Sequence, residues 1–434
     1  MQLKVLIAAA LVALAGCSNQ GGQGQAGADA AAELRAAAND PKLARFYEAR
    51  GWRTAWTDEN AAALDAAIND AQRHGLDPAT LRPRIPSGAS AAQSDAARTR
   101  AALEYAEALA RGRTDPARLR DPYTISRPNP DLTGGLARAV DGGDLGQWLA
   151  GLAPQDEDYR TMSATYLQTR RRIDAAQGRA APALLANART LAVNLERRRW
   201  LEREPAATRI DVDTGAATLT YVRDNQVADR RPVVVGEPGK ETPALASPLY
   251  RLVANPTWTV PRSIEQEEIV PKGEAYMARN DMERRDGQIV QKSGPRNSLG
   301  LVKFDMRNDH AIYLHDTPAK ALFGQPERHR SHGCVRVQDA LGFARLIATD
   351  QGVLEQWERA RRKDEDEEEQ YEEAFVELPR AIPVRLLYHT AHVENGRVVI
   401  VPDVYGWDDE VARALGLPAG PRRTARRSGG DLGP

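Results

Sequence analysis

Apolar residues recur at helical spacing through the first half of the chain. Between about residues 40 and 200, segments such as Ala96–Gly112 place apolar side chains every three or four positions. Gly75 and Gly112 stand at the ends of two of these segments, where glycine commonly terminates a helix. The pattern therefore predicts a helical N-terminal domain over residues 41–204.

The hydrophobic period changes at Arg209. From there to Gly236 apolar and polar residues alternate, and Asp-Thr-Gly and Asp-Asn separate the runs, which is typical of a β-meander. Further alternating runs follow, with one helical pattern for which Asp339 is a candidate N-cap. Asn395-Gly396 predicts the turn of a later hairpin. We therefore expect an α+β fold, in which a mostly β domain over residues 205–406 follows the helical one.

Three segments depart from these patterns. Residues from about 262 to 300 are polar, charged and punctuated by Gly and Pro, and so long a loop within a compact domain is typically functional or disordered. Residues 363–377 form an acidic run, which predicts a solvated helix or linker inserted in the β domain. Residues 407–434 predict a C-terminal helix and a disordered, Arg/Gly-rich tail.

The N-terminus has the features of an export signal. Lys4 precedes an apolar stretch, Val5 to Ala15, that is too short to span a bilayer as a helix. Leu-Ala-Gly-Cys, ending at Cys17, resembles a bacterial lipobox, in which the cysteine thiol is lipidated; an ordinary secretory signal is the alternative. The sequence predicts a signal peptide over residues 1–17 and a flexible tether over residues 18–40, because the latter holds almost no large apolar residue.

This signal predicts that the protein lies in the periplasm, anchored to a membrane through its N-terminal lipid. Ser18 stands where an Asp would favour retention at the inner membrane, so we expect the outer membrane rather than the inner one. The formal net charge is −1, and there is no basic excess that would indicate a nucleic-acid partner.

The small number of cysteines distinguishes one loop of the chain. The chain has two cysteines, and if Cys17 carries lipid, Cys334 has no partner for a disulfide within the chain. A single cysteine left in an exported protein is reactive or forms an intermolecular bond. Cys334 lies in the sequence SHGCVRV.

Three interpretations of this loop compete. The first is nucleophilic catalysis, in which His315, at the end of an apparent strand, accepts the proton of the Cys334 thiol. Gly333 would let backbone N–H groups point at an oxyanion, and Arg336 could pair with a substrate carboxylate. The second is a metal site from Cys334 and nearby histidines, although the spacing fits no familiar ligand pattern. The third is an inert, buried cysteine. The residues favour the first, which needs no cofactor and no metal.

The wider sequence resembles a known family. The sequences HDTP and SHGCVRV, with His315 and Cys334 at this separation, are similar to the signature of the L,D-transpeptidases with a YkuD-type catalytic domain. Residues 233–264, SGPRNSLGLVKF and PVRLLYHTAHV resemble the long, lid-bearing branch of that family, termed YcbB-like. The resemblance covers most of residues 46–406, so it implies that the helical domain is a scaffold and the β domain is catalytic.

The resemblance also implies a reaction. Cys334 would be the nucleophile toward a peptidoglycan donor tetrapeptide, and the diaminopimelate side-chain amine of an acceptor stem would resolve the acyl-enzyme to give a 3–3 cross-link. His315 would be the base, oriented by the backbone carbonyl of Asp316. Backbone N–H groups of Gly333 and Cys334 would form the oxyanion hole.

Other matching residues would contact substrate or cover it. Arg336 and Tyr313 would line the substrate site, and His332 matches the motif with either a structural or a catalytic role. Residues 262–300 would form the mobile lid of the branch. The resemblance further implies acylation of the cysteine by carbapenems. The sequence departs from the branch in lacking a recognisable peptidoglycan-binding module before Arg198.

Two alternative functions remain open at this stage. The same site would act as an L,D-carboxypeptidase if water resolved the acyl-enzyme, or would attach or detach wall-anchored proteins. A catalytically silent scaffold lipoprotein is the third possibility, against which the intact pair of His315 and Cys334 argues.

Overall fold

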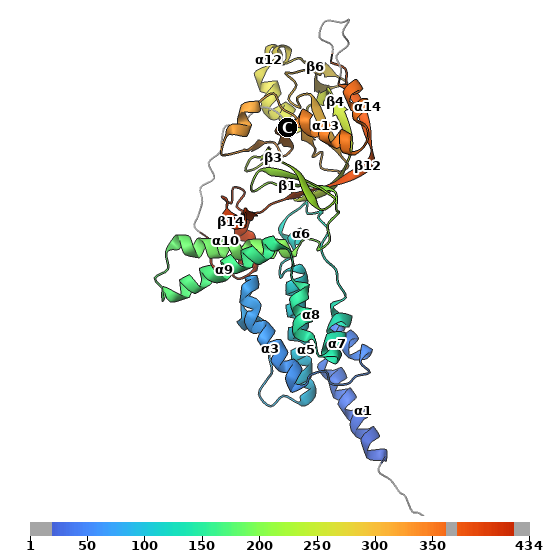
Figure 1. The fold of residues 1–434 in the computed structure, drawn as a ribbon, viewed down its shortest axis with the longest axis vertical. Helices are drawn as coiled ribbons and strands as arrows, with labels where there is room; N and C mark the ends of the chain where they lie inside the picture. Colours follow the sequence, from blue (N-terminus) through green and yellow to red (C-terminus); the bar gives the residue numbers. More distant parts are fainter. Residues whose placement is uncertain (1–19, 362–370, 421–434) are drawn as a thin grey trace, which may run out of the picture. The chain divides into compact units, whose positions relative to one another are not determined.

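The computed structural model describes residues 20–361 and 371–420 (Figure 1). The predicted lipidation site Cys17, most of the acidic run and the C-terminal tail lie outside these residues. Within the described ranges, none of the helices combines the length and apolarity needed to cross a membrane. The chain divides into two compact units, the first made of residues up to 69, 78–106 and 131–150, and the second of the remaining residues.

The first unit is helical, as the sequence predicts. Its helices are α1 (Gln20–Ala37), α2 (Pro41–Ala49), α3 (Asp58–Asn69), α4 (Pro78–Leu81), most of α5 (Ala91–Arg111), α7 (Leu132–Gly142) and most of α8 (Leu145–Leu152). A buried carboxylate, Asp95, accepts hydrogen bonds from the Tyr47 hydroxyl at 2.6 Å and from the Ala55 N–H at 2.9 Å. Because this buried carboxylate has hydrogen-bond donors around it, its burial between the helices costs less than that of an unpaired charge.

The tether predicted over residues 18–40 is wrong for most of its length, since Gln20–Ala37 forms helix α1. Leu34 is 1% exposed and Ala38 is 7% exposed. The prediction rested on the lack of large apolar residues, whereas the alanines in the second half of α1 have the highest intrinsic helix propensity and Leu34 in this half is buried.

The predicted boundary of the helical domain also differs from the structure. Several helical segments between residues 41 and 204 belong to the second unit: η1 (Asp70–His74), α6 (Pro116–Leu119), α9 (Glu157–Ala175) and α10 (Pro182–Arg199). The pair α9 and α10 contacts the hairpin of β13 (Ala391–Glu394) and β14 (Arg397–Ile400). Asn395 and Gly396 form the hairpin turn with φ of 50° and 72°, which confirms the predicted turn.

A nine-stranded sheet forms the centre of the second unit, in the order β10-β3-β11-β9-β8-β4-β12-β1-β2. Its strands are β1 (Arg209–Asp213), β2 (Thr218–Arg223), β3 (Gln226–Gly236), β4 (Leu245–Ala254), β8 (Val302–Met306), β9 (Leu314–His315), β10 (His329–Ser331), β11 (Val335–Val337) and β12 (Ala374–Leu387). Strand β2 also pairs with β3, so the series of pairings closes on itself. The predicted meander over residues 209–236 is confirmed as β1, β2 and β3.

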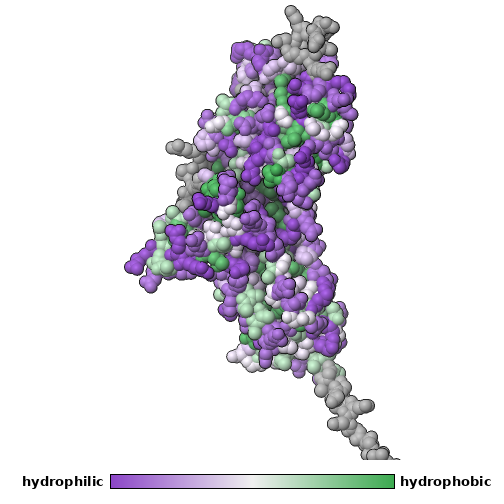
Figure 2. Space-filling model, in the orientation of Figure 1, coloured by the Kyte–Doolittle hydropathy of each residue, from purple (hydrophilic) through white to green (hydrophobic). Residues whose placement is uncertain are grey.

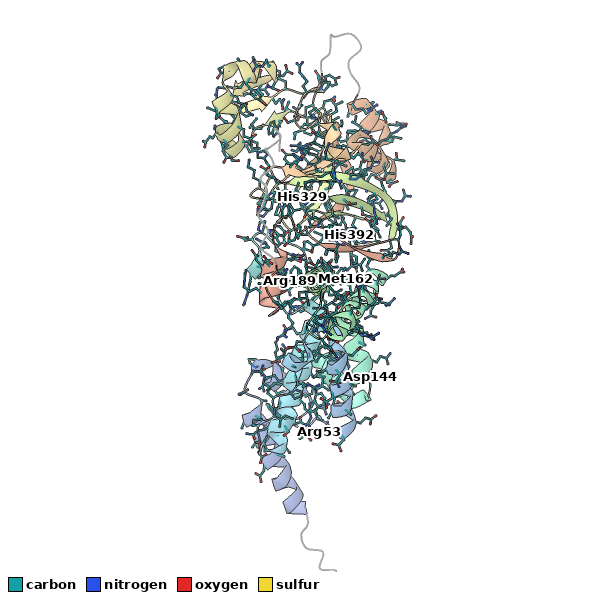
Figure 3. All side chains as sticks on the ribbon, turned by 90° about the vertical axis from the view of Figure 1, so that its left-hand side faces the viewer. Arg53, Asp144, Met162, Arg189, His329 and His392 are labelled. Carbon is teal, nitrogen blue, oxygen red and sulfur yellow. The ribbon has the colours of Figure 1, made fainter. Side chains whose placement is uncertain are left out.

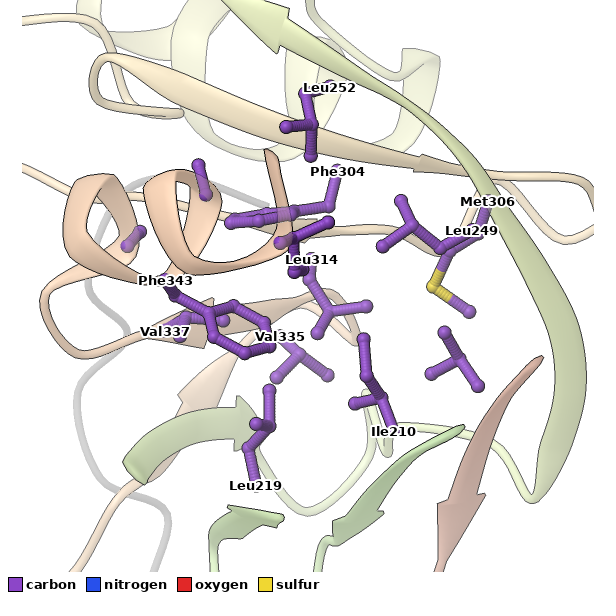
Figure 4. Packing of buried hydrophobic residues seen from close by; sticks show 14 of the residues in the cluster. Ile210, Leu219, Leu249, Leu252, Phe304, Met306, Leu314, Val335, Val337 and Phe343 are labelled. Atoms are coloured by element: carbon purple, nitrogen blue, oxygen red, sulfur yellow. The ribbon is translucent and has the colours of Figure 1, made fainter. Parts of the chain in front are cut away.

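Helix α13 (Ala340–Asp350) completes the core of this unit. Its N-cap is Asp339, as predicted, whose carboxylate accepts from the Gly342 N–H at 3.2 Å. Phe343 of α13 packs on Phe304 of β8 with ring centroids 5.5 Å apart, among the apolar side chains that Figure 4 shows. Further helices of this unit are η4 (Lys320–Gly324), α14 (Leu354–Ala360) and α15 (Asp408–Ala414).

Strand β12 corrects the reading of the acidic run. Residues 374–377, predicted as part of the solvated insert, begin this strand and pair with β4, where Ala374 faces Ala254. The Glu373 carboxylate accepts from the Thr257 N–H at 2.8 Å. The alternating apolar residues after Ala374 form one continuous strand. The prediction for residues 374–377 was wrong because it followed the acidic residues before them rather than this alternation.

Residues 262–300, called here the lid segment, are folded rather than a structureless loop. They contain α11 (Arg262–Ile264), η2 (Glu265–Ile269), η3 (Val270–Lys272), α12 (Glu274–Arg279), β6 (Met282–Arg285) and β7 (Gln288–Gln291). Strand β7 pairs with β5 (Trp258–Thr259) and with β6. Ile269, Met277 and Ile289 join Trp258 in a small apolar core of this segment, which gives it an ordered shape of its own.

Hydrophilic residues predominate on the face of the molecule shown in Figure 2. Large exposed hydrophobic residues such as Val227, Val270 and Phe375 lie in three different elements. Single exposed apolar residues of this kind are normal for a protein surface.

Candidate active site

Strands β9 and β11 bring the two predicted catalytic residues together. The strands are parallel, with His315 opposite Arg336 and Leu314 opposite Val335, and the Val335 N–H donates to the Tyr313 carbonyl at 3.1 Å. Cys334 directly precedes β11, and β11 is the neighbour of β9, the strand that carries His315. The pairing of these two strands therefore brings together two residues that lie nineteen positions apart in the sequence.

Tyr313 contacts both members of the pair. Its ring centroid lies 5.7 Å from that of His315, and its phenol interacts with the Cys334 thiol. Burial, and then the neighbouring Cys334, raise the pKa of Tyr313 well above its ordinary value, so the phenol stays neutral. The predicted place of Tyr313 beside the site is consistent with this geometry.

The site is buried in this conformation. Cys334 is 5% exposed and His315 is fully buried. Burial raises the pKa of the Cys334 thiol to about 11, although Tyr313, Lys303 and Arg336 oppose the shift. The thiol lies 3.6 Å from the Ala311 carbonyl, to which it can donate. A thiol that is protonated at neutral pH needs a base for nucleophilic catalysis, the role that the sequence predicts for His315.

The loop before Cys334 turns tightly at Gly333, whose φ is 117°. Only glycine adopts such a conformation without strain. The Ser331 hydroxyl donates to the Cys334 carbonyl at 2.6 Å and accepts from the Gly333 N–H at 3.2 Å. This differs from the expectation that the Gly333 N–H serves an oxyanion, because that group already has an acceptor here.

Asp316 is buried beside His315 and is engaged through its side chain. Its carboxylate accepts from the Leu301 N–H at 3.1 Å and pairs with Lys320. Its own N–H donates to the Val302 carbonyl at 2.9 Å. These bonds fix the end of β9, while the predicted role of the Asp316 carbonyl in orienting the imidazole stays a prediction.

Arg336 lies inside the sheet rather than at its surface. It is 1% exposed and pairs with Val234 of β3 on one side and with His315 on the other. This burial does not favour the expected contact with a substrate carboxylate. The positive charge of Arg336 instead lowers the pKa of the nearby Cys334 thiol, against the larger effect of burial.

His332 contacts the lid segment. Its imidazole hydrogen-bonds the carboxylate of Glu268 in η2, and the Lys240 Nζ lies 3.2 Å from the same carboxylate. Burial alone would raise the pKa of Glu268, but His332 and Lys240 together lower it below its ordinary value. The geometry favours the structural role for His332, since its partner belongs to the lid segment rather than to the catalytic pair.

The other two histidines of this region, His329 and His310, differ in their surroundings. His329, labelled in Figure 3, hydrogen-bonds the Thr214 carbonyl at 2.8 Å and the Glu327 carboxylate at 2.5 Å. His310 is exposed. Within residues 20–361 and 371–420 there is no group of three or more His, Cys, Asp or Glu side chains arranged to bind a metal ion. The arrangement of these described side chains therefore does not support the interpretation of the loop as a metal site.

Sequence reasoning missed three side chains that contact the loop or influence the thiol. They are Glu268, Thr242 and Lys303, which lie in the lid segment, after β3 and in β8. Thr242 and Lys303 lie within segments that resemble the family branch, and Glu268 lies in the charged lid segment, but no local pattern distinguishes these residues from their neighbours.

Comparison with known proteins identifies the two domains. Residues 207–355 match the YkuD family, described as the L,D-transpeptidase catalytic domain. By this match, residues 207–355 form an L,D-transpeptidase catalytic domain. Residues 41–165 match a family described as the scaffold domain. The catalytic sheet extends beyond the matched residues of the YkuD domain, because β12 pairs with both β1 and β4.

One curated relative is similar to about half of this chain. A Haemophilus influenzae protein named "Putative L,D-transpeptidase" is 30% identical over 225 residues, which is 46% of this chain and 45% of that protein. The match thus spans about half the length of this curated relative.

Solved structures of L,D-transpeptidases are more distant. One is the catalytic domain of an Enterococcus faecium L,D-transpeptidase acylated by ertapenem, with 18% identity, 32% of this chain and 85% of that chain covered, and a TM-score of 0.20. Another is an L,D-transpeptidase from Mycobacterium smegmatis, with 16% identity, 32% and 52% covered, and a TM-score of 0.22.

Proposed function

We propose that this protein is a peptidoglycan L,D-transpeptidase that forms 3–3 cross-links through an acyl-enzyme on Cys334. The observation that carries the proposal is the pairing of β9 with β11 inside the matched catalytic domain, which places His315 beside the loop of Cys334. A thiol just before one strand and an imidazole on the neighbouring strand supply the two groups that acyl transfer through cysteine requires.

The first half-reaction would proceed as follows. His315 takes the proton of the Cys334 thiol, and the thiolate attacks the carbonyl at the L-centre of diaminopimelate in a donor tetrapeptide. The negative charge that develops on the carbonyl oxygen is stabilised by the Cys334 N–H. Collapse of the tetrahedral intermediate breaks the bond to D-Ala, whose amine receives the proton from the imidazole, and leaves a thioester.

The second half-reaction consumes the thioester. The side-chain amine of an acceptor stem gives a proton to His315 and attacks the thioester carbonyl. The sulfur leaves as a thiolate and is reprotonated by the imidazole, so the enzyme returns to its starting state. The lid segment, joined to this loop through Glu268 and His332, would exclude the water that otherwise hydrolyses the thioester.

We propose further that the protein acts in the periplasm, anchored by lipid on Cys17. The motif at the end of the apolar N-terminal stretch supports the anchor. A Cys17→Ala variant expressed in a Gram-negative host should leave the membrane fraction and lose its lipid mass. Lipid still present on that variant would contradict the anchor.

Product analysis tests the enzymatic proposal. The purified protein is incubated with disaccharide tetrapeptides, and the products are measured by mass spectrometry beside those of Cys334→Ser. Cross-linked dimers that have lost one D-Ala, formed only by the unmodified protein, are the expected result. Monomeric stems shortened by D-Ala without dimers would identify a carboxypeptidase instead. Unchanged substrate with a folded protein would refute both activities.

A further inference from the structure

One buried hydroxyl joins the end of β3 to the loop that carries the nucleophile. The Thr242 hydroxyl donates to the Gly333 carbonyl at 2.8 Å and accepts from the Gly236 N–H at 2.9 Å. Thr242 is 1% exposed, so water does not compete for these bonds. The carbonyl of Gly333 therefore has a fixed direction relative to the sheet.

Fixing this carbonyl also fixes the amide that follows it. In a trans peptide the C=O and the next N–H point in opposite directions, so Thr242 orients the N–H of Cys334 away from itself. The neighbouring backbone groups have other partners: Ser331 accepts from the Gly333 N–H, and the Val335 N–H donates to Tyr313. None of these bonds uses the Cys334 N–H, the donor that the proposed oxyanion needs.

Tyr405 supports Thr242 from outside the matched catalytic residues. Its hydroxyl donates to the Gly236 carbonyl at 2.7 Å and accepts from the Thr242 N–H at 3.4 Å. Burial raises the pKa of Tyr405 far above its ordinary value, so the phenol remains a donor. The Tyr405 ring stacks on Tyr388 with centroids 5.0 Å apart, and the Tyr388 hydroxyl accepts from the Tyr405 N–H at 3.1 Å.

Gly236 allows this close approach. A Cβ at this position would lie 2.2 Å from the Lys240 carbonyl oxygen and 2.6 Å from the Thr242 nitrogen. A side chain at residue 236 would therefore push the segment that carries Thr242 away from β3. The backbone from Gly236 to Thr242 folds back on itself, and its position is determined by glycine and by the Tyr405 hydroxyl.

We propose that Thr242 is a positioning residue for acyl transfer, and that Tyr405 holds it in place. Thr242 orients the Cys334 N–H toward the developing oxyanion and has no part in deprotonating the thiol. The inference rests on the proposed acyl-enzyme function, because it concerns the oxyanion formed when Cys334 attacks a carbonyl.

Two reactions of the same thiol separate this role from a structural one. Acylation by ertapenem passes through a tetrahedral oxyanion, whereas alkylation by iodoacetamide is a direct displacement that forms none. The full-length protein and the variants Thr242→Val, Thr242→Ser and Tyr405→Phe are compared in both reactions, with intact mass as the readout. Valine has the shape of threonine without the hydroxyl, and serine restores the hydroxyl.

Thr242→Val should lower the maximal rate of acylation about 10- to 100-fold, since loss of an oxyanion donor costs about 10²–10³-fold. The ertapenem concentration for half-maximal rate and the pH profile of alkylation should stay unchanged. Thr242→Ser should acylate within about threefold of the unmodified protein, and Tyr405→Phe should be intermediate.

Other results would overturn the inference. If Thr242→Val and Tyr405→Phe acylate at the unmodified rate, the hydroxyl does not position the donor. If both variants lose alkylation and acylation in equal proportion, the role is structural. If the unmodified protein is alkylated but not acylated, the proposed function itself fails, and the inference fails with it.

Discussion

Glu268 of the lid segment is hydrogen-bonded to His332, two residues before Cys334. Lys240, after β3, lies 3.2 Å from the same carboxylate, so one charged group of the lid segment has two partners on the catalytic side. The Glu268 side chain is 19% exposed, which limits the screening of these contacts by water. The lid segment and the catalytic loop thus meet at this carboxylate.

Removing that charge should loosen the lid segment. Glu268→Gln keeps the size of the side chain but loses the charge-assisted bonds, so we expect trypsin to cleave within residues 262–300 about three to ten times faster. Glu267→Gln is the matched control, because Glu267 is 63% exposed and lies 3.8 Å from the Lys240 Nζ. Equal cleavage rates in the two variants would show that Glu268 does not restrain the segment.

The buried thiol predicts an unusual pH profile for the resting protein. Because burial raises the pKa of Cys334 to about 11, the reactive thiolate fraction should increase about tenfold per pH unit from pH 7 to pH 10. The alkylation rate with iodoacetamide, measured by intact mass while circular dichroism confirms the fold, should follow the same slope. A plateau below pH 8 would mean that His315 already holds the thiol as an ion pair.

Loss of His315 should slow the acylation of Cys334 more than its alkylation. His315→Gln removes the proton acceptor, so the acylation rate with ertapenem should fall about 10²–10⁴-fold, the usual contribution of general base catalysis. His310→Gln is the control, since His310 is exposed and lies outside the β9–β11 pairing. An acylation rate in His315→Gln equal to that of the control would remove His315 from the mechanism.

His74, a buried histidine of the second unit, should make the stability of the fold decrease in acid. Burial, and then the nearby charge of Arg199, lower the pKa of His74 to about 3. Because the unfolded chain binds the proton from about pH 6.5 downward and the folded chain does not, stability should be complete above pH 6.5 and decline toward pH 3. His74 should lower the free energy of unfolding by up to about 1.4 kcal/mol for each pH unit of this decline.

Urea unfolding at pH 7, 5 and 4 measures this decline. His74→Gln retains a hydrogen-bonding group for the Tyr159 hydroxyl, which lies 3.0 Å from the His74 Nδ1, but it cannot bind a proton. The free energy of unfolding of this variant should change less with pH than that of the unmodified protein. The same pH dependence in both proteins would exclude His74 as the cause.

The parts of the fold that depend on local pattern could be predicted. Alternation gave the meander of residues 209–236, and Asp339 and Asn395-Gly396 marked a helix start and a hairpin turn that the structure confirms. Helix α1 was missed because its residues lack large apolar side chains, while its helicity comes from alanine and from the burial of Leu34.

The candidate site was predictable only in part, for a physical reason. Cys334 and His315 are rare residue types in a recognisable motif. The residues that hold the loop are common polar types whose partners are distant: Glu268 lies 64 positions from His332, Thr242 lies 91 positions from Gly333, and Tyr405 lies 169 positions from Gly236. Contacts of this kind come from the tertiary fold, and no local pattern encodes them.

The most direct test of the central claim is the intact mass of the protein after incubation with ertapenem, for the unmodified chain and for Cys334→Ala. We expect one adduct on the unmodified protein and none on the variant, because Cys334 is the free cysteine of the described residues and the proposed nucleophile. An adduct on both proteins, or none on a folded unmodified protein, would contradict a cysteine acyl-enzyme at this site.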